Sequence, residues 1–399
     1  MSSKKILAIG DVANTFSVLK KFTKNYEIDL INFPWDTANR STELDDAEFF
    51  NSLKVKEQVD KINSIKHNYE LAIVNTWSGA LVAYLCGLDY ILFFVGAALR
   101  VPLFKKNPKL EYLKNPLPTL NVFERKFYKK ILDNAIFCGA NANDLFIELQ
   151  KYRKKDIFEI GIPVDTQLFS AHVKPLDLKK NKFTFLSAQR IGLAKGIDII
   201  WKAIEMTKTD FEVLQVDWFL GQRTDEEREI NEKLKTNRPK KVKIIPVFKR
   251  EDIPRAFVSV DAVIGQMKNG LGATIEREAA YCRIPVLQYA DPKIKFKAGD
   301  KISNSPFLPH SNNPEVIAEL IDKIVTSKEF RENLVDQEFN FVKAVADPIV
   351  ISAQWEKLFS NAIKIKQKCK RSKFQLKIRL YYFLFANKLY FRKIKNRFF

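Results

Sequence analysis

The sequence predicts an α/β protein with two doubly wound domains that face a cleft, followed by a basic amphipathic C-terminal tail. Three observations predict this fold class. Apolar runs alternate with amphipathic stretches along most of the 399 residues, which is typical of parallel sheets covered by helices on both faces. The alternation pauses at the polar, lysine-rich stretch 170–182 and then restarts. Residues 361–399 contain 9 Lys, 4 Arg and no acidic residue.

In the first half, apolar runs predict strands and the amphipathic stretches between them predict helices. The expected strands are 6–9, 28–32, 71–74, 90–95, 135–138 and 157–160. The expected helices are 14–24, 45–65, 79–87, 119–132 and 142–152. The most apolar stretch, 79–104, is interrupted by Asp89 and Arg100, whereas a spanning helix needs about 20 apolar residues. We therefore expect a buried helix and strand there.

In the second half the same alternation predicts a second parallel sheet. The expected strands are 183–187, 211–220, 242–247, 261–265 and 285–289. The expected helices are 196–207, 225–236, 273–282 and 314–326, with a final amphipathic helix at 348–366. We expect the domains to span 1–170 and 171–347, and the tail to span 367–399. Ligands of such folds bind at the carboxyl ends of strands, often between domains.

Composition excludes several classes of protein. A hydrophobic content of 46% excludes disorder for most of the chain. The four cysteines are far apart and none forms a C-x-x-C pair, so a disulfide scaffold or a cysteine zinc site is not expected. Reduced cysteines and an N-terminal apolar run too short for a signal peptide favour a cytoplasmic protein. The net charge is +20, of which 361–399 carry +13, so the body alone gives little reason to expect nucleic-acid binding.

Three segments could carry chemistry. The segment SAQRIGLAKG (187–196) joins an expected strand to an expected helix and holds Arg190, Lys195 and Gly196. Basic side chains and free N–H groups at such a helix N-terminus form a site for phosphate, although two solvated cations in a plain loop would look the same. The segment at 268–287 contains Gly270-Leu271-Gly272, whose glycines allow close backbone approach to a ligand.

The acids Glu276 and Glu278 of this second segment have two interpretations. A buried glutamate could accept hydrogen bonds from sugar hydroxyls, or both could stabilise the helix dipole as first-turn acids. From the residues alone the second interpretation is favoured. The third segment, GIPVDTQLF (161–169), alone indicates only a loop.

Together, the order and spacing of these segments resemble the family 4 (group 1) glycosyltransferases of the GT-B fold. GIPVDTQLF is similar to the family's N-G-V-D-x-x-x-F turn, and 187–196 to its G-R-x-x-x-x-K-G loop, with Gln189 in place of the Gly. Residues 260–286 resemble its acidic strand followed by E-G-F-G-x-x-x-x-E-A-x-A-x-G-x-P-V, and 313–321 resemble a later P-E-x-x-A-x-x-I helix. The resemblance in motifs covers roughly residues 135–360, whereas residues 1–134 are similar only in the alternation of expected strands and helices.

The resemblance implies two Rossmann-like domains, with a nucleotide-sugar donor on the second and the acceptor on the first. It implies that Arg190 and Lys195 neutralise the donor diphosphate and its leaving charge, and that Gly196 and Gly270, Leu271 and Gly272 approach the donor. It implies that Glu278 bonds the donor ribose and that the final helix, around Trp355, crosses back to the first domain. Family chemistry is retaining, and the leaving phosphate can assist it.

Three departures from the family pattern stand out. The first Glu of the E-G-F-G motif is absent, and the spacing to Glu278 is off by one. The stretch 95–100 lacks the His of many relatives. No D-x-D occurs in the sequence, so we expect no metal and no other cofactor, and charge neutralisation shifts to Arg190 and Lys195.

The tail predicts an association with membranes. At helical spacing, five apolar residues of 374–399 form one face: Phe374, Ile378, Tyr381, Phe385 and Leu389. Basic residues surround this face, and the segment contains nine aromatic residues in all. Such a helix is typical of the membrane interface, with anionic lipid as the partner of 370–399. A tail packed on the body, or bound to RNA, is the alternative.

The sequence therefore predicts a glycosyltransferase that moves a hexose-type sugar from a nucleotide-sugar donor to a glycan or lipid-linked acceptor. It would lie peripherally on the inner face of the cell membrane. Two other interpretations remain: a nucleotide-sugar epimerase of the same fold, and a non-catalytic GT-B scaffold or binding protein. Nucleic acid is not an expected partner, and strong, salt-sensitive RNA binding through 361–399 would contradict this.

Overall fold

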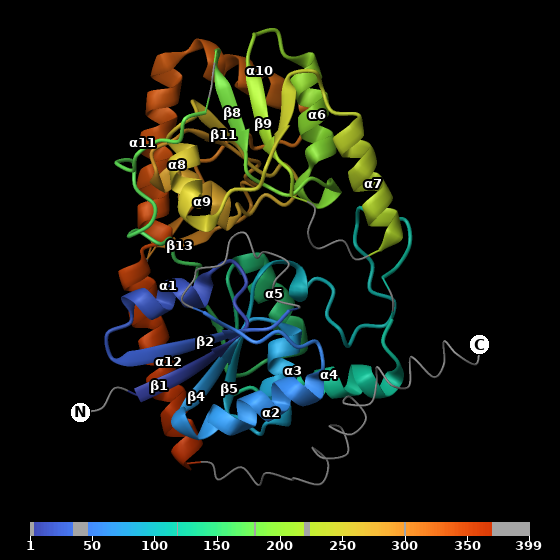
Figure 1. Cartoon of the computed structure of the whole chain (residues 1–399), viewed down its shortest axis with the longest axis vertical. Helices are drawn as coiled ribbons and strands as arrows, with labels where there is room; N and C mark the ends of the chain where they lie inside the picture. Colours follow the sequence, from blue (N-terminus) through green and yellow to red (C-terminus); the bar gives the residue numbers. More distant parts are fainter. Residues whose placement is uncertain are drawn as a thin grey trace.

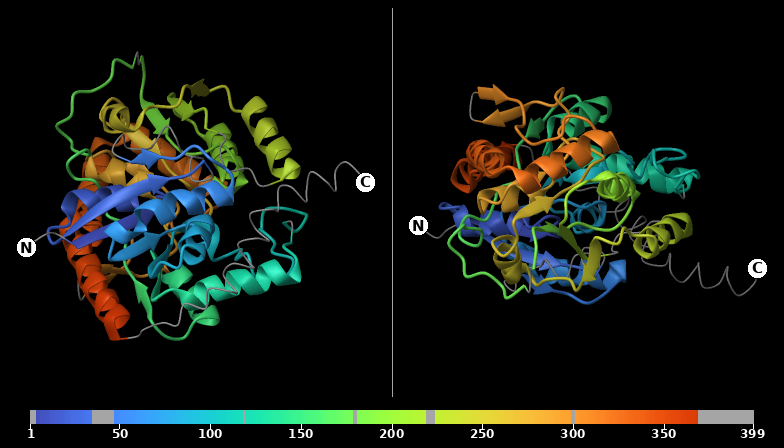
Figure 2. Two further views of the ribbon diagram at one scale, coloured as in Figure 1. Left: turned by 60° about the horizontal axis from the view of Figure 1, so that its bottom comes forward. Right: turned by 90° about the horizontal axis from the view of Figure 1, so that it is seen from above.

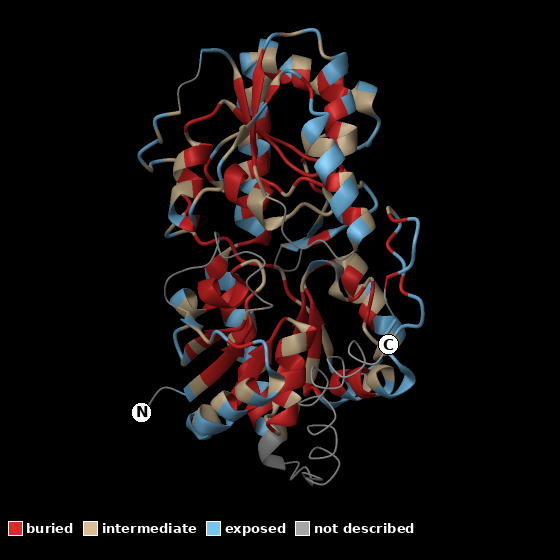
Figure 3. Cartoon of the chain, turned by 45° about the vertical axis from the view of Figure 1, so that its right-hand side comes forward, coloured by how far each residue is buried: buried red, intermediate tan, exposed pale blue. Residues whose placement is uncertain are grey.

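The computed structural model describes residues 4–34, 47–117, 119–178, 181–218, 224–298 and 301–368. Within them, two parallel sheets lie one above the other, each covered by helices on both faces (Figure 1). Buried residues fill the sheets and the inner faces of the helices, and exposed residues lie on the outer faces (Figure 3). The predicted fold class, two doubly wound α/β domains, is confirmed for this part of the chain.

The first sheet has the strand order β3-β2-β1-β4-β5-β6-β7, and its strands are all parallel. The strands are β1 (Lys4–Ile9), β2 (Tyr26–Asn32), β3 (Glu48–Phe49), β4 (Leu71–Val74), β5 (Tyr90–Phe94), β6 (Phe137–Ala140) and β7 (Ile157–Glu159). Its helices are α1 (Thr15–Phe22), α2 (Val55–Ile65), α3 (Trp77–Leu85), α4 (Val122–Asn134) and α5 (Asn143–Tyr152). The strand order reverses beside β1, and such a reversal opens a crevice at the carboxyl ends of the strands.

The second sheet has the order β10-β9-β8-β11-β12, also all parallel. The strands are β8 (Thr184–Ser187), β9 (Glu212–Val216), β10 (Val242–Ile245), β11 (Ala262–Ile264) and β12 (Val286–Leu287). The helices are α6 (Ile197–Met206), α7 (Asp225–Thr236), α8 (Ile253–Phe257), α9 (Thr274–Tyr281), α10 (Pro314–Thr326) and α11 (Lys328–Val345). A short antiparallel hairpin, β13 (Phe296–Ala298) and β14 (Lys301–Ser303), follows β12.

Several elements differ from the sequence prediction, which contained neither α8 nor the β13–β14 hairpin. The expected helix 45–65 begins only at Val55, because Glu48–Phe49 pairs with β2 and the Phe50 N–H donates to the Asn32 carbonyl. Helix α11 was not predicted. Glu338 lies on its buried face and interrupts the apolar pattern, because its carboxylate accepts a hydrogen bond from the Val286 N–H of β12 at 2.9 Å.

The last described helix, α12 (Pro348–Lys368), packs along the first domain (Figure 2). The Trp355 ring is fully buried there, with its centroid 6.0 Å from that of Phe16, 5.0 Å from Phe93 and 5.6 Å from Phe158. Aromatic pairs at these separations stabilise beyond their area burial. The chain therefore crosses between the domains twice.

The two crossings lie side by side. The Val164 N–H of the outgoing crossing donates to the Ala346 carbonyl of the returning one at 3.0 Å. The buried Asp165 carboxylate joins them to the first domain through the Lys21 ammonium of α1, at 2.7 Å. The turn 161–169 is therefore one of the two packed connections between the domains, and we call this place the hinge.

Helices α11 and α12 are the two longest described helices, and neither is apolar enough to cross a membrane; the same holds for every other helix of the described residues. The predicted interfacial tail, 370–399, lies outside these residues. Three of the four cysteines are buried free thiols, as expected: Cys86, Cys138 and Cys282.

Candidate functional site

The loop between β8 and α6 is held against the end of β11. Gly196 has φ 72°, and a Cβ there would lie 3.0 Å from the Met267 carbonyl carbon. The Met267 N–H donates to the Lys195 carbonyl at 2.9 Å. Only glycine combines this left-handed backbone with so close an approach at low cost. Gly196 therefore fixes the position of Lys195 at the N-terminus of α6.

Gln189, which stands where the family pattern has glycine, supports the same loop. Its side chain is buried, and the Nε2 group donates to the Gly265 carbonyl at 2.9 Å. The Gln215 amide in turn donates to the Gln189 carbonyl at 2.8 Å. These two bonds join β8, β9 and β11 at their carboxyl ends. The departure from the family pattern thus stabilises the loop.

Lys195 lies in a positive environment. Burial is the largest cause that lowers the pKa of its ammonium, and the charges of Arg190 and Arg100 lower that pKa further, while Glu276 raises it. Arg100 belongs to the first domain, where it pairs with Asp144 at 2.6 Å. The charges of Arg190 and of Arg100, one from each domain, therefore act on Lys195, with Glu276 as the opposing acid. An anion placed there would stabilise all three charges.

Arg100 was not among the residues singled out from the sequence. It ends the stretch 95–100, which lacks the histidine of many relatives, and in the sequence it stands out only as an interruption of an apolar run. The signal available was a lone cation after a buried strand, β5, whose carboxyl end faces the second domain. Only the packing of the two domains brings it near Lys195.

The glycine loop 270–272 is folded down onto the chain after β12. Gly270 and Gly272 have φ values of 64° and 68°, and a Cβ on Gly270 would lie 2.6 Å from the Asp291 Cβ. The Gly270 carbonyl accepts from the Asp291 N–H at 3.0 Å, and Leu271 forms an isolated bridge with Ala290. Both glycines are therefore needed for the shape of the loop itself. Their predicted approach to a donor stays a prediction.

Glu276 anchors the N-terminus of α9. Its carboxylate accepts from the Gln266 N–H at 2.9 Å and from the Ala273 N–H at 3.1 Å. The interpretation of Glu276 as a helix-stabilising first-turn acid is confirmed. Gly265 provides the room, because a Cβ on that residue would lie 2.3 Å from the Glu276 Cγ.

Glu278 is placed differently from what the resemblance implies. Its carboxylate is buried and accepts two hydrogen bonds from the Arg250 guanidinium, at 2.9 and 2.5 Å. The guanidinium lies over the Phe169 ring, 4.6 Å from its centroid. A ribose hydroxyl could reach Glu278 only if Arg250 moved. In this arrangement Glu278 is the acid of a buried ion pair, and the geometry does not support the predicted ribose contact. The first-turn interpretation of Glu278 is also wrong, because the helix's only first-turn acid is Glu276.

The first domain presents Asp11 at the carboxyl end of β1. Its carboxylate accepts hydrogen bonds from the Phe16 and Ser17 N–H groups at 3.0 and 2.8 Å, so it anchors α1. Burial raises the pKa of this carboxyl. Across the described ranges, no three His, Cys, Asp or Glu side chains are grouped as a metal ion would require.

Comparison with known proteins agrees with this architecture. The family model of the glycosyl transferases group 1 matches residues 169–340, which include the loop 187–196, the loop 270–272 and α9. The predicted resemblance is thereby confirmed for the second domain. No curated protein matches the chain.

Solved structures show that the whole fold is GT-B. Anabaena HepE in complex with UDP and glucose is 15% identical with a TM-score of 0.63, and the match covers 90% of this chain and 100% of that one. Sucrose-phosphate synthase from Thermosynechococcus elongatus is 13% identical with a TM-score of 0.66, covering 91% and 100%. A putative UDP-N-acetylglucosamine 2-epimerase from Listeria monocytogenes is 12% identical with a TM-score of 0.51, covering 91% and 97%.

Proposed function

We propose that this chain is a glycosyltransferase that transfers a hexose-type sugar from a nucleotide-sugar donor to a glycan or lipid-linked acceptor. The observation that carries the proposal is a group of three cations: Arg190 and Lys195 of the loop after β8, and Arg100 of the first domain, whose charge acts on Lys195. A diphosphate is an anion that arginine and lysine side chains bind through charge-assisted hydrogen bonds. The match of 169–340 to the group 1 family supports the same donor class.

The nucleotide we propose is uridine diphosphate, because HepE, a neighbour in fold, was crystallised with UDP, with UDP and glucose, and with UDP-glucose. The donor would lie on the second domain, between the 187–196 loop and the 270–272 loop. The acceptor would lie on the first domain, across the cleft.

The chemistry we propose is transfer with retention at the anomeric carbon. The bond between that carbon and the diphosphate oxygen breaks, and its electron pair leaves with the diphosphate. Arg190 and Lys195 stabilise the negative charge that develops on this leaving group. The acceptor hydroxyl forms the new bond with the anomeric carbon, and its proton passes to an oxygen of the leaving phosphate. Because the sequence has no D-x-D, we propose that these side chains act without a metal.

We also propose that the protein works at the cytoplasmic face of the membrane, in the biosynthesis of a polysaccharide or glycolipid. The aromatic and basic residues of 370–399 support this location. A lipid-linked acceptor would then be concentrated near the cleft.

The proposal is tested by titrating UDP and UDP-sugars into the full chain in a calorimeter. Arg190→Ala and Lys195→Ala should each weaken UDP binding at least tenfold, since each removes a charged partner of phosphate worth about 1.5–3 kcal/mol. Lys202→Ala is the matched control, because Lys202 is an exposed lysine on α6, the helix that follows the loop. If no nucleotide binds, or if all three variants bind UDP alike, the donor site is wrong.

A second candidate is a non-catalytic GT-B binding protein. The ion pair between Arg250 and Glu278 favours this candidate, because Arg250 occupies the carboxylate that was expected to bind the donor ribose. The two candidates differ in turnover. Release of UDP from a UDP-sugar in the presence of acceptor lipids supports the transferase, and tight UDP binding with no release of UDP supports the binding protein. The epimerase alternative predicts conversion of the sugar on the donor itself, which proton NMR of the nucleotide sugar would detect.

A further inference from the structure

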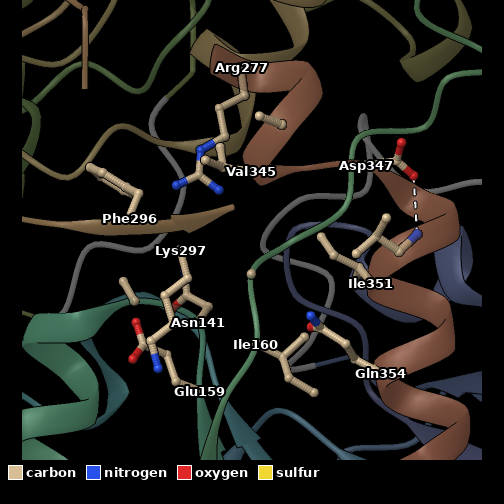
Figure 4. Close-up of a pocket in the computed structure, with 14 residues that line it drawn as sticks. Asn141, Glu159, Ile160, Arg277, Phe296, Lys297, Val345, Asp347, Ile351 and Gln354 are labelled. Carbon is tan, nitrogen blue, oxygen red and sulfur yellow. Dashed lines mark hydrogen bonds between the residues drawn. The ribbon is translucent and has the colours of Figure 1, made fainter. Parts of the chain in front are cut away.

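A cavity of about 90 Å³ lies between the two domains, beside the hinge. Its walls come from the ends of β6 and β7, from α9, from β13 and from the start of α12 (Figure 4). None of its lining residues belongs to the 187–196 loop or the 270–272 loop. The cavity is therefore separate from the proposed donor site. Its volume is several times what one water molecule needs.

Arg277 of α9 points into this cavity (Figure 4). The residue is only 6% exposed, and within the described residues its guanidinium has no hydrogen bond or ion pair. Its one close neighbour of note is the Phe296 ring, whose centroid lies 5.7 Å from the guanidinium carbon. Burial lowers the pKa of this guanidinium to about 10. Buried arginines are almost always paired, so a buried arginine without a partner needs an explanation.

The acids near Arg277 are already engaged elsewhere. Glu276 uses both carboxylate oxygens on backbone N–H groups of α9 and β11. Asp347 accepts from the Ile349 and Val350 N–H groups at the start of α12. Burial is the largest influence on Glu159, across the cavity, and raises the pKa of its carboxyl, while the charge of Lys297 lowers it. Among the described residues, none of these three acids forms an ion pair with Arg277.

A second polar group in the cavity also lacks a partner. The side-chain oxygen of Asn141, which lines the cavity from the end of β6, is buried without a hydrogen bond. An amide side chain can present either its oxygen or its NH₂ group to a ligand, since the two ends exchange by rotation. The first and second domains therefore each supply one unsatisfied polar side chain to the same space.

We propose that this cavity binds one oxyanion, a phosphate or a carboxylate group, held by Arg277 of the second domain and Asn141 of the first. The guanidinium fork matches both groups in a bidentate geometry. Lys297, an exposed lysine of β13 on the cavity wall, adds positive charge at the entrance. The proposal does not rest on the proposed glycosyltransferase function.

The position of the cavity has a consequence for domain movement. Its wall includes Gly161 of the outgoing crossing and Val345 beside the returning one. A Cβ on Gly161 would lie 3.2 Å from the Val345 carbonyl oxygen, so the crossings are tightly packed here. An anion bound at this point contacts both domains, and it would favour the domain arrangement in which Arg277 and Asn141 line the same cavity.

The test is thermal unfolding of the full-length Arg190→Ala/Lys195→Ala variant, in which the proposed donor site no longer competes for phosphate. Sodium phosphate should raise its melting temperature in a saturable way, compared with sodium chloride at equal ionic strength. Adding Arg277→Leu should abolish this rise. Arg228→Leu, which removes an arginine whose side chain is 62% exposed, should leave the rise intact.

Without phosphate, Arg277→Leu should melt at the same temperature or higher, because it removes an unpaired buried charge. If Arg277→Leu does not fold, Arg277→Lys keeps the charge without the fork, and its phosphate-induced rise should be smaller at every concentration. Equal rises in the parent and in the Arg277 variants, or no rise in the parent, would overturn the site.

Two further probes identify the source of the anion. Glucuronate presents a carboxylate on a sugar, and glucose 1-phosphate presents a phosphate on one. If the ligand is a free ion, inorganic phosphate acts at the lowest concentration. If the group belongs to a larger molecule, one of the sugar anions acts at a lower concentration than phosphate, and its effect also disappears in Arg277→Leu.

Discussion

The buried ion pair between Arg250 and Glu278 allows a quantitative prediction. The two side chains are 5% and 2% exposed, and two hydrogen bonds join them. Replacing Arg250 with Met keeps much of the apolar stem over Phe169 but leaves the Glu278 carboxylate without its opposing charge. Removal of one partner from such a pair costs about 3–5 kcal/mol of unfolding free energy. We expect Arg250→Met to fall in this range near neutral pH.

The cost should depend on pH, and its sign follows from Glu278. Burial already raises the pKa of this carboxyl with Arg250 present. Without Arg250 the folded-state pKa rises further, whereas in the unfolded chain it stays at about 4.3. The folded variant then binds the proton that the unfolded chain releases, so its stability is highest in acid and falls as pH rises through this window. The destabilisation by Arg250→Met should be smaller at pH 5 than at pH 8.

Urea unfolding of the full chain at both pH values measures this. Arg255→Met is the matched control, because Arg255 forms an ion pair with Asp252 while 40% exposed, and such pairs contribute at most about 1 kcal/mol. The double variant Arg250→Met/Glu278→Leu should cost much less than the sum of its two single variants, because both charges leave together. The reasoning is refuted if Arg250→Met costs no more than Arg255→Met, or if the single costs add.

Three other outcomes are expected. Gly196→Ala should lower stability by about 1–2 kcal/mol, because alanine at φ 72° is strained, and calorimetry of the two proteins side by side would show it. UDP affinity should fall as pH rises toward the lowered pKa of Lys195, since a neutral lysine cannot pair with phosphate. The variant Lys195→Met should bind UDP weakly at every pH. Without UDP, the protein should gain stability over the same pH range, because burying a charged Lys195 is costly. The full chain should cosediment with phosphatidylglycerol vesicles but not with phosphatidylcholine vesicles, and removal of 370–399 should abolish the cosedimentation with phosphatidylglycerol. Unchanged binding of the truncated chain would remove the tail from the membrane proposal.

Much of the fold could be predicted because its strands are buried on both faces. A strand such as Tyr90–Phe94, buried at every position, must be apolar throughout, and such runs are visible without any structure. Helix α11 was missed for the opposite reason. Its buried Glu338 serves the Val286 N–H, and a polar residue on an inward face breaks the periodicity by which helices are recognised.

The candidate site was predictable only where one loop holds it. Arg190, Lys195 and Gly196 are neighbours in sequence, so their motif could be read directly. Arg100 and Lys195 come together only when the two domains pack, and a local pattern contains no information about that distance. The Arg250 partner of Glu278 lies 28 residues away and follows a different strand, so no local pattern indicates that the two residues pair.

These placements change how donor recognition must work if the proposed function is right. The family pattern assigns two glutamates to the sugar and the ribose, but the first is absent here and the second is paired with Arg250. The groups that remain at the donor loop are cations, which attract phosphate regardless of the sugar attached to it. Charge attraction is strong but not selective, whereas a buried hydrogen-bonding group rejects ligands that leave it unpaired. Selectivity for the sugar must therefore come from elsewhere in the cleft, and the side of the cleft opposite Lys195, where Arg100 approaches from the first domain, is the place to look for it.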